Sequence, residues 1–205
     1  MKLKVCGLSN TIEVETCVSN NVDYCGFILN YSKSHRFIPF NKAKDLTKID
    51  KKGSKYVGVL VKPSKEELLL FSKLNLDYFQ LYGDYKSDEL MEIKEKYKKK
   101  IIFGLQVKDE EDVNNYKFIE TVSDIILWDS SGYEKSLSWD YKWLKSISIK
   151  AEKMIAGNIT IDKINNLKYL TDSIDVSGAL ETNKVKDIDK IKKFIIEVKK
   201  ISNEN

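Results

Sequence analysis

Eight short runs of apolar residues divide this chain at nearly regular intervals, and each run is rich in Val, Ile, Phe and Tyr. Runs that are apolar almost without interruption are typical of strands buried on both faces of a parallel sheet. We therefore predict eight strands, at Leu3 to Cys6, Tyr24 to Leu29, Tyr56 to Val61, Tyr78 to Leu81, Ile101 to Gln106, Ile125 to Trp128, Lys153 to Ala156 and Ile174 to Val176.

The segments between these runs carry apolar residues at spacings of three and four, which is the pattern of a helix with one buried face. Ser64 precedes one such segment and can cap it, with Glu66 and Glu67 in the first turn. Ser87 and Asp187 begin two more. Further helices are predicted near residues 11–20, 41–50, 110–120, 139–148 and 162–170.

Strands and helices thus alternate along 205 residues, which leaves roughly 26 residues for each strand with its helix and loops. Two prolines occur in the sequence, and no Ser- and Gly-rich linker marks a second domain. We predict an α/β fold in which residues 1–205 form a single (β/α)8 barrel domain, a TIM barrel, with its site at the carboxyl ends of the strands. The alternative is a doubly wound open sheet, which usually has fewer strands and a glycine-rich first turn, whereas CGLSN has one glycine.

The composition argues against several kinds of partner. The chain has 35 Lys and Arg against 31 Asp and Glu, and its basic runs lie among Glu or apolar residues, as on solvated helix faces rather than nucleic-acid-binding surfaces. No apolar run is long enough to cross a bilayer, and the first ten residues do not read as a signal peptide. We expect a cytoplasmic protein that binds neither nucleic acid nor a membrane.

The cysteines and the histidine limit the possible chemistry. Cys6, Cys17 and Cys25 are odd in number and form no CxxC, so neither a disulfide framework nor a zinc site is indicated. The one histidine, His35, lies in a polar loop and cannot supply a cluster of His metal ligands. We expect chemistry that rests on Cys, Asp, Glu, Lys, Arg or backbone groups, with no metal and no cofactor.

Polar residues follow the ends of six predicted strands, where a barrel of this kind places its site. We predict that they line one pocket. They are Cys6 at the first strand, Arg36 after the second, Gln80 and Tyr82 at the fourth, Asp129 at the sixth, Gly157 and Asn158 at the seventh, and Asp175, Ser177 and Gly178 at the eighth.

The same strand ends carry eight short motifs, which are K-x-C-G at Lys4 to Gly7, G-F-I at Gly26 to Ile28, S-x-R at Ser34 to Arg36, V-G-V at Val57 to Val59, Q-L-x-G at Gln80 to Gly83, L-x-D-S at Leu127 to Ser130, A-G at Ala156 and Gly157, and D-V-S at Asp175 to Ser177. In this order they resemble the phosphoribosylanthranilate isomerase family over nearly the whole chain. The resemblance implies a (β/α)8 barrel, without metal or cofactor, that converts N-(5-phosphoribosyl)anthranilate to 1-(2-carboxyphenylamino)-1-deoxyribulose 5-phosphate in tryptophan biosynthesis. It implies a small phosphorylated substrate, and we expect a monomer or a homodimer.

This Amadori rearrangement needs an acid to open the ribose ring and a base to remove the proton on C2. The resemblance implies that Asp129 is the acid and Cys6 the base. The acid needs a raised pKa, which apolar neighbours such as Ile125 and Leu127 on the same strand face would favour. The thiol needs a lowered pKa, and Lys4 lies on the same strand face. From its position alone, Cys6 could equally be a small buried hydrophobic residue.

A substrate of this kind also needs partners for its carboxylate and its phosphate. Arg36 has a guanidinium group that can hold a planar carboxylate through two hydrogen bonds, and the resemblance implies that it binds the anthranilate carboxylate; most arginines, however, simply lie on the surface. We predict the phosphate beside Gly157, where backbone can approach closely, and beside Ser177 and Gly178, which can open a short helix. These glycines could also be plain turn residues. The predicted substrate-binding set is Arg36, Gln80, Tyr82, Gly157, Asn158, Asp175, Ser177 and Gly178.

Three positions depart from the family pattern. Family members commonly have His where Tyr82 stands, Ser-Gly where Gly178 and Ala179 stand, and a glycine-rich stretch where Ser131 to Lys135 stand. Two other functions stay open. One is another phosphosugar isomerase or epimerase on the same barrel, and the other is a non-catalytic barrel that binds a phosphorylated ligand or a partner subunit.

Overall fold

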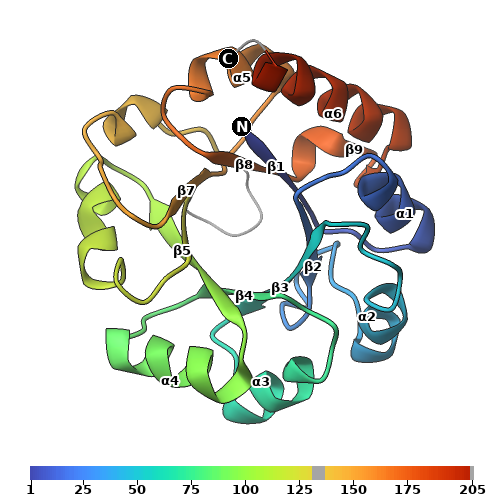
Figure 1. Cartoon of the computed structure of the whole chain (residues 1–205), viewed down its shortest axis with the longest axis vertical. Helices are drawn as coiled ribbons and strands as arrows, with labels where there is room; N and C mark the ends of the chain where they lie inside the picture. The colour runs from blue at the N-terminus through green and yellow to red at the C-terminus, as the bar shows by residue number, and fades with distance from the viewer. Residues whose placement is uncertain (131–136, 204–205) are drawn as a thin grey trace.

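The computed structural model describes residues 1–130 and 137–203, and in these residues eight parallel strands form a closed barrel (Figure 1). Each strand pairs with the next along the chain, and the last pairs with the first. The predicted barrel is confirmed, and the doubly wound open sheet is wrong. The strands are β1 (Lys2–Cys6), β2 (Tyr24–Ile28), β3 (Lys55–Val61), β4 (Tyr78–Tyr82), β5 (Lys100–Val107), β6 (Ile125–Ser130), β7 (Glu152–Ile155) and β8 (Ser173–Val176).

Helices surround the barrel in Figure 1. The α-helices are α1 (Thr11–Ser19), α2 (Phe40–Leu46), α3 (Lys65–Ser72), α4 (Ser87–Tyr97), α5 (Ile164–Leu167) and α6 (Ile188–Asn203). The 3-10 helices are η1 (Glu111–Phe118), η2 (Tyr141–Leu144), η3 (Ile161–Lys163) and η4 (Gly178–Leu180), and a hairpin of β9 (Glu181–Thr182) and β10 (Val185–Lys186) follows η4. The predictions of regular helices near 110–120, 139–148 and 162–170 are therefore wrong in type or length, and the hairpin was not predicted.

The crossover after β5 shows why a helical pattern gave a 3-10 helix. Val113, Tyr116 and Ile119 follow one another at intervals of three; Val113 and Ile119 are buried, and Tyr116 packs against the core. An interval of three matches the three residues per turn of a 3-10 helix, whereas an α-helix needs a mixture of threes and fours. Asn114 and Asn115, which lie between Val113 and Tyr116, are poor α-helix formers, so propensity does not oppose the 3-10 helix.

Two apolar layers pack against the strands. Alternate residues of a strand point to opposite sides of the sheet. On β6, Ile125 and Leu127 belong to the cluster inside the barrel, as predicted, and Ile126 and Trp128 belong to the cluster between the strands and the helices. The strands are apolar throughout because both of their faces are buried, which is why the unbroken apolar runs identified them.

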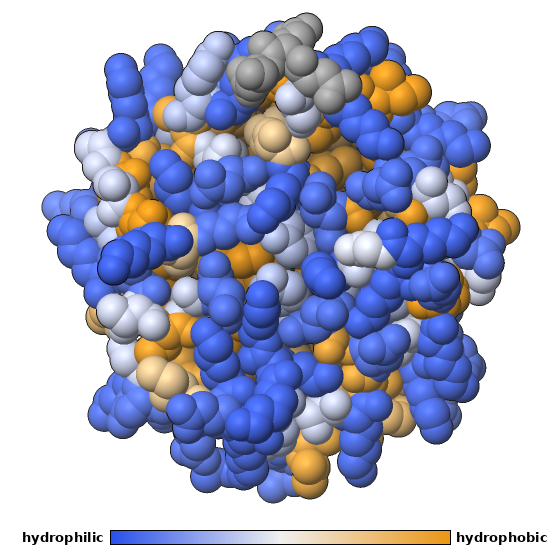
Figure 2. All heavy atoms as spheres, viewed as in Figure 1, coloured by the Kyte–Doolittle hydropathy of each residue, from blue (hydrophilic) through white to orange (hydrophobic). Residues whose placement is uncertain are grey.

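The two ends of the described chain meet beside the barrel. The amino group of Met1 donates a hydrogen bond to the hydroxyl of Ser202 (3.1 Å), and α6 packs against α1. In Figure 2 hydrophilic residues cover most of the visible face and divide the apolar ones into small groups. Within the described ranges, no helix combines the length and the apolar character that a membrane crossing requires.

Ser64 caps α3, as the sequence predicts. Its hydroxyl accepts a hydrogen bond from the backbone N–H of Glu67 (3.2 Å), and the Glu67 carboxylate accepts one from the backbone N–H of Ser64 (2.8 Å). These bonds satisfy N–H groups that have no partner within the helix. The same carboxylate accepts a hydrogen bond from the Asn30 side chain (3.3 Å), so the cap also ties α3 to the loop after β2.

We expect Ser64→Ala to lower the free energy of unfolding by about 1 kcal/mol, because it removes one bond of the cap. Ser72→Ala is the matched control, since the Ser72 hydroxyl donates to the Leu69 carbonyl at the other end of the same helix. That change should cost less than about 0.5 kcal/mol. Urea unfolding followed by circular dichroism measures both variants, and equal destabilisation would contradict the role given to Ser64.

Candidate active site

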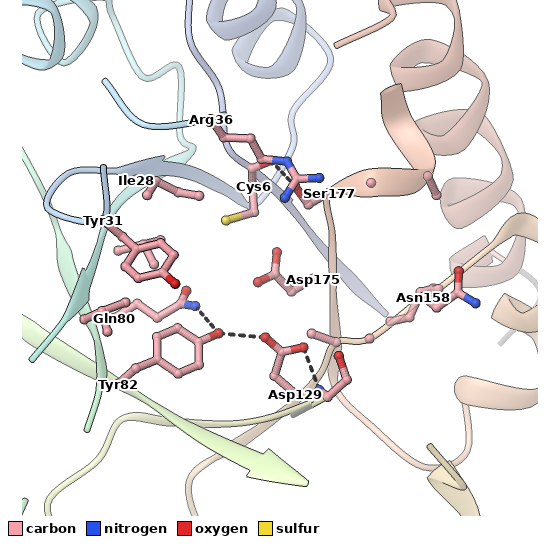
Figure 3. A pocket seen from close by; sticks show the side chains of 18 residues that line it. Cys6, Ile28, Tyr31, Arg36, Gln80, Tyr82, Asp129, Asn158, Asp175 and Ser177 are labelled. Carbon is pink, nitrogen blue, oxygen red and sulfur yellow. Dashed lines mark hydrogen bonds between the residues drawn. The ribbon is translucent and has the colours of Figure 1, made fainter. Parts of the chain in front are cut away.

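One cavity lies at the carboxyl ends of the strands, and all ten residues predicted for the site line it (Figure 3). They come from β1, β4, β6 and β8 and from the loops after β2, β7 and β8. Closure of the barrel brings these strand ends together although they are far apart in the sequence. The ten are Cys6, Arg36, Gln80, Tyr82, Asp129, Gly157, Asn158, Asp175, Ser177 and Gly178.

Asp129 lies near the end of β6, and both of its carboxyl oxygens are held. Oδ2 accepts a hydrogen bond from the Tyr82 hydroxyl (2.9 Å), and Oδ1 accepts one from the backbone N–H of Ser130 (2.8 Å). Burial and the nearby charge of Asp175 raise the pKa of Asp129 to about 6, against the effect of these two bonds. The pKa of Asp129 is therefore closer to neutral pH than that of an ordinary aspartate. The raised pKa that an acid requires is present.

Cys6 ends β1, and Figure 3 shows Asp175 between it and Asp129. Burial raises the pKa of Cys6, and the charge of Lys4 together with a hydrogen bond from it offsets this effect only in part. The ammonium group of Lys4 also donates to Oδ2 of Asp175 (2.7 Å). The lowered pKa that a thiolate base needs is therefore absent in the protein without substrate, because burial of the thiol outweighs the effect of Lys4.

Tyr82 connects Gln80 to Asp129 (Figure 3). Nε2 of Gln80 donates to the hydroxyl oxygen of Tyr82 (3.0 Å), and the hydroxyl donates to Asp129. Burial and the charge of Asp129 keep the pKa of Tyr82 well above its ordinary value, so the hydroxyl keeps its proton. Both residues of β4 face the cavity, as predicted.

Arg36 reaches the cavity from the loop after β2. Its side chain passes over Gly7, where a Cβ would lie 2.5 Å from Cδ of Arg36, and Gly7 has a φ of +79°, so glycine is favoured there on both counts. Nε and Nη2 of Arg36 donate to the two carboxylate oxygens of Glu181, at 2.5 and 3.0 Å. A carboxylate of the chain itself thus engages one edge of the guanidinium group in the two-bond geometry expected for the ligand.

The residues after β8 contribute a second polar side of the cavity. Gly178 begins η4, so the short helix predicted after β8 is confirmed. The Ser177 hydroxyl donates to the backbone carbonyl of Cys6 (3.0 Å) and accepts a hydrogen bond from Nζ of Lys186 (3.1 Å). A positive charge therefore lies directly beside the backbone predicted to approach the phosphate.

The residues after β7 approach the cavity mainly through their backbone. A Cβ at Gly157 would lie 2.9 Å from the carbonyl oxygen of Leu137, and the Gly157 carbonyl accepts a hydrogen bond from Tyr141. The amide of Asn158 donates to the Ser138 hydroxyl (2.9 Å) and points away from Asp129 in Figure 3. Gly157 thus packs closely against Leu137, and the Asn158 amide is engaged by the preceding loop.

The arrangement favours acid–base chemistry. A partly buried carboxyl group and a buried thiol border one cavity, which Arg36, Gly157, Ser177 and Gly178 also line. In residues 1–130 and 137–203, no three His, Cys, Asp or Glu side chains gather as a metal site would require. His35 lies beside Glu181 instead, with Nε2 3.1 Å from Oε2.

Comparison with known proteins gives the family. The sequence matches the N-(5'-phosphoribosyl)anthranilate (PRA) isomerase family over residues 3–197. This chain belongs to the PRA isomerase family. The resemblance read from the strand-end motifs is thereby confirmed.

Individual PRA isomerases align over nearly their full length. The N-(5'-phosphoribosyl)anthranilate isomerase of Streptococcus mutans is 33% identical over 202 residues, which cover 97% of this chain and 99% of the relative. That of Streptococcus pneumoniae is 33% identical over 201 residues, which cover 97% and 96%. The Thermotoga maritima PRA isomerase structure has a TM-score of 0.87 at 24% identity, covering 98% of this chain and 99% of that one. A PRA isomerase complex with reduced 1-(o-carboxyphenylamino)-1-deoxyribulose 5-phosphate has a TM-score of 0.82 at 23% identity, with the same coverage.

Other residues that hold the cavity of this PRA isomerase family member were not predicted from the sequence. Glu181 and Lys186 lie on the hairpin of β9 and β10, and Lys186 donates to Glu181 (2.8 Å). Asn183 and Lys184 join the two strands, both with positive φ, which is a turn usually marked by a glycine. Asn183 was the one residue whose type suggested this turn, and a single Asn indicates a turn only weakly. Tyr31, which lines the cavity from the loop after β2, was also not predicted.

The departures from the family pattern have different outcomes. Tyr82 keeps a ring and a hydrogen bond to Asp129. Gly178 still begins a short helix. The segment Ser131 to Lys135 lies outside the described residues.

The ion pairs of Glu181 predict a pH-dependent stability. Burial alone would raise the pKa of Glu181, but hydrogen bonds and charges from Arg36 and Lys186 hold it at about 2. A carboxyl group whose pKa is lower in the folded protein stabilises the fold above its unfolded pKa of about 4.3 and loses that contribution as the pH falls toward 2. We expect Glu181→Gln to be less stable than wild type near neutral pH, with the difference shrinking below about pH 4.5.

Urea unfolding of both proteins across this pH range measures the difference. Glu197→Gln is the control, because Glu197 pairs with Lys200 on the more exposed side of α6, and its effect should stay within about 0.5 kcal/mol at every pH. A Glu181→Gln difference that does not change with pH would show that Glu181 acts by packing and not by charge.

Proposed function

We propose that this chain converts N-(5-phosphoribosyl)anthranilate to 1-(2-carboxyphenylamino)-1-deoxyribulose 5-phosphate in tryptophan biosynthesis, with Asp129 as general acid and Cys6 as general base. The observation that carries the roles is a desolvated carboxyl group with a pKa of about 6 that borders the same cavity as a buried thiol. Membership of the PRA isomerase family supports the reaction.

In the first step Asp129 gives its proton to the ring oxygen of the ribose. The bond between C1 and the ring oxygen breaks, and the nitrogen lone pair forms the C1–N double bond of a Schiff base. Asp129 is suited to this step because its raised pKa lies within reach of neutral pH. The two hydrogen bonds to its oxygens fix the plane of the carboxyl group before the substrate arrives.

In the second step the thiolate of Cys6 removes the proton on C2. The electron pair of that C–H bond becomes the C1–C2 double bond, and the C1–N π electrons return to nitrogen as a lone pair, which gives an enolamine. The enolamine then tautomerises to the aminoketone product. Lys4 stabilises the thiolate by its charge and by a hydrogen bond.

The two anionic groups of the substrate have separate partners in this proposal. Arg36 is directed to the anthranilate carboxylate, with Glu181 fixing one edge of its guanidinium group. The phosphate is directed to the backbone at Gly157, Ser177 and Gly178, beside the Lys186 ammonium group. Gln80, Tyr82, Asn158 and Asp175 complete the binding set.

We further infer a cytoplasmic enzyme that needs neither nucleic acid nor a membrane and works as a monomer or a homodimer. A solved relative from Thermotoga maritima is described as made of monomers generated from a dimeric PRA isomerase, which supports the second arrangement.

We expect Cys6→Ala and Asp129→Asn each to lower turnover by at least about a hundredfold, the scale of general acid or base catalysis. Two matched controls are Cys17→Ala, a buried cysteine outside the cavity, and Asp124→Asn, next to the opposite end of β6. Both controls should keep turnover within about threefold of wild type, whatever they cost in stability. Steady-state kinetics on purified proteins decides, and growth without tryptophan in cells lacking the isomerase tests the reaction itself. A Cys6 or Asp129 variant that keeps more than about a tenth of turnover would overturn that residue's role.

The two pKa values predict a bell-shaped dependence of kcat/KM on pH. The reactive form needs protonated Asp129 and ionised Cys6. Below the pKa of Asp129, near 6, a rise in pH increases the thiolate while the acid stays protonated, so the rate rises. Between the two pKa values the gain in thiolate and the loss of acid cancel, and the rate is flat. Above the raised pKa of Cys6 the thiolate is complete while the acid keeps falling, so the rate falls.

The lower limb needs a direct assignment, because the second ionisation of a phosphate monoester also lies near pH 6. Infrared difference spectra of wild type against Asp129→Asn, recorded without substrate, report the protonated carboxyl group of Asp129 alone. We expect it to be half protonated at about pH 6. Half protonation at pH 4, the ordinary range of Asp, would remove the physical basis for Asp129 as the acid.

A further inference from the structure

Two buried side chains, Gln80 and Tyr82, are joined by hydrogen bonds that end on the proposed acid. Nε2 of Gln80 donates to the Tyr82 hydroxyl (3.0 Å), which donates to Oδ2 of Asp129 (2.9 Å), as drawn in Figure 3. Gln80 and Tyr82 are 1% and 6% exposed. Water therefore has little access to Gln80 and Tyr82, so their own donors and acceptors decide which way the hydrogen bonds run.

The position of the Tyr82 hydroxyl is fixed by packing on the neighbouring strand. The Tyr82 ring lies over Gly104 of β5, where a Cβ would come within 2.4 Å of Cε1 of the ring. Any side chain at position 104 would push the ring away and move the hydroxyl from Asp129. The absence of a side chain at Gly104 thus leaves room for the Tyr82 ring and lets its hydroxyl reach Asp129.

At the other end of this series of hydrogen bonds, the Gln80 amide can either donate or accept. A glutamine amide carries a donor and an acceptor, and Oε1 of Gln80 is buried without a hydrogen-bond partner among the described residues. Rotation of the amide by 180° exchanges Nε2 and Oε1, so that Gln80 can present an acceptor to the Tyr82 hydroxyl in place of a donor.

We propose that Gln80 and Tyr82 are positioning residues that hold Asp129 in both of its protonation states by reversing their hydrogen bonds. With the carboxylate, Gln80 donates to Tyr82 and Tyr82 donates to Asp129. With the carboxylic acid, Asp129 donates from Oδ2 to Tyr82, and Tyr82 donates to Oε1 of the rotated Gln80. No covalent bond changes and no proton crosses these hydrogen bonds. The inference rests on the proposed function, because it takes Asp129 as the acid.

Reversal matters because the acid changes protonation state in every turnover. If Tyr82 could only donate, it would hold the Asp129 carboxylate well, but its hydrogen would face the hydrogen of the protonated carboxyl group. Because the two hydrogen bonds can reverse, Tyr82 keeps a hydrogen bond to Asp129 in both protonation states. Other charged and titratable groups also act on Asp129 and Tyr82. They are Asp175 of β8, Lys4 and Cys6 of β1, and Tyr141 of η2. These groups do not contribute to the two links and stay unchanged in the variants below.

The test uses the whole enzyme and three variants. Tyr82→Phe removes the hydroxyl and keeps the ring over Gly104. Gln80→Met removes both polar atoms of the amide and keeps the length of the side chain. Tyr24→Phe is the matched control, because Tyr24 also lies inside the barrel and its hydroxyl donates to Glu152 (2.8 Å) rather than to Asp129. Thermal unfolding establishes that each variant is folded.

The first measurement is the infrared titration of Asp129 without substrate. A hydroxyl that donates to a carboxylate favours the ionised form, so its loss in Tyr82→Phe should raise the half-protonation pH by about one unit. Gln80→Met removes a partner from both states and should leave the midpoint within about half of that shift. Tyr24→Phe should match wild type. In steady-state kinetics, Tyr82→Phe and Gln80→Met should each lower kcat about tenfold with KM changed less than about threefold, while Tyr24→Phe keeps both.

The second measurement follows the Gln80 amide by NMR with labelled glutamine side chains, assigned by its absence in Gln80→Met. In wild type its resonances should move with the same midpoint as Asp129, and in Tyr82→Phe they should no longer follow that titration. An amide that ignores the titration in wild type, or an Asp129 midpoint that Tyr82→Phe leaves in place, would overturn the proposal. Neither measurement needs activity, so an inactive wild type or an active Asp129→Asn would count against the proposed function separately.

Discussion

The barrel and its site both depend on the buried ion pair between Lys4 and Asp175. The two residues are register partners where β1 pairs with β8, and Nζ lies 2.7 Å from Oδ2. Removal of either partner would leave the other charge buried, at a cost of about 3–5 kcal/mol. The ion pair therefore lies where β1 and β8 close the barrel, and Asp175 also lines the cavity. The charge of Asp175 helps to raise the pKa of Asp129, and Lys4 opposes the raised pKa of Cys6.

This environment explains why the resting ionisation of the proposed acid and base is the reverse of the reactive one. Burial disfavours the charged form of both groups, so Asp129, with the lower intrinsic pKa, carries most of the negative charge, and Cys6 keeps its proton. The reactive form differs by one proton moved from Cys6 to Asp129. The net charge of the cavity does not change, and the negative charge moves toward Lys4. Reaching the reactive state therefore requires no further charge to be buried.

The sequence predicted the strands and the ten lining residues because parallel strands place their ends on one face whatever the loops between them do. It could not predict features that depend on distant partners. The pKa of Cys6 depends on whether Lys4 also reaches Asp175, which lies 171 residues further along the chain. Glu181 lies beyond the last barrel strand, on a hairpin whose turn contains no glycine, so neither its position nor a turn motif marked it in the sequence. Apolar residues three apart also occur within the α-helical pattern of threes and fours, so the sequence predicted a regular helix after β5 where the structure has a 3-10 helix.

The tyrosine at position 82, where family members commonly have histidine, depends on the neighbouring strand β5 as well as on β4. A ring of this size reaches Asp129 because Gly104 on β5 leaves room for it. The hydroxyl stands at the end of a rigid, buried ring, so the hydrogen bond to Asp129 requires little further loss of side-chain freedom. A flexible side chain at position 82 would have to be ordered at each encounter with substrate. Asp129 is thus oriented by packing that is complete once the barrel has closed, and a side chain at position 104 would act on Asp129 through the Tyr82 ring, although position 104 does not line the cavity.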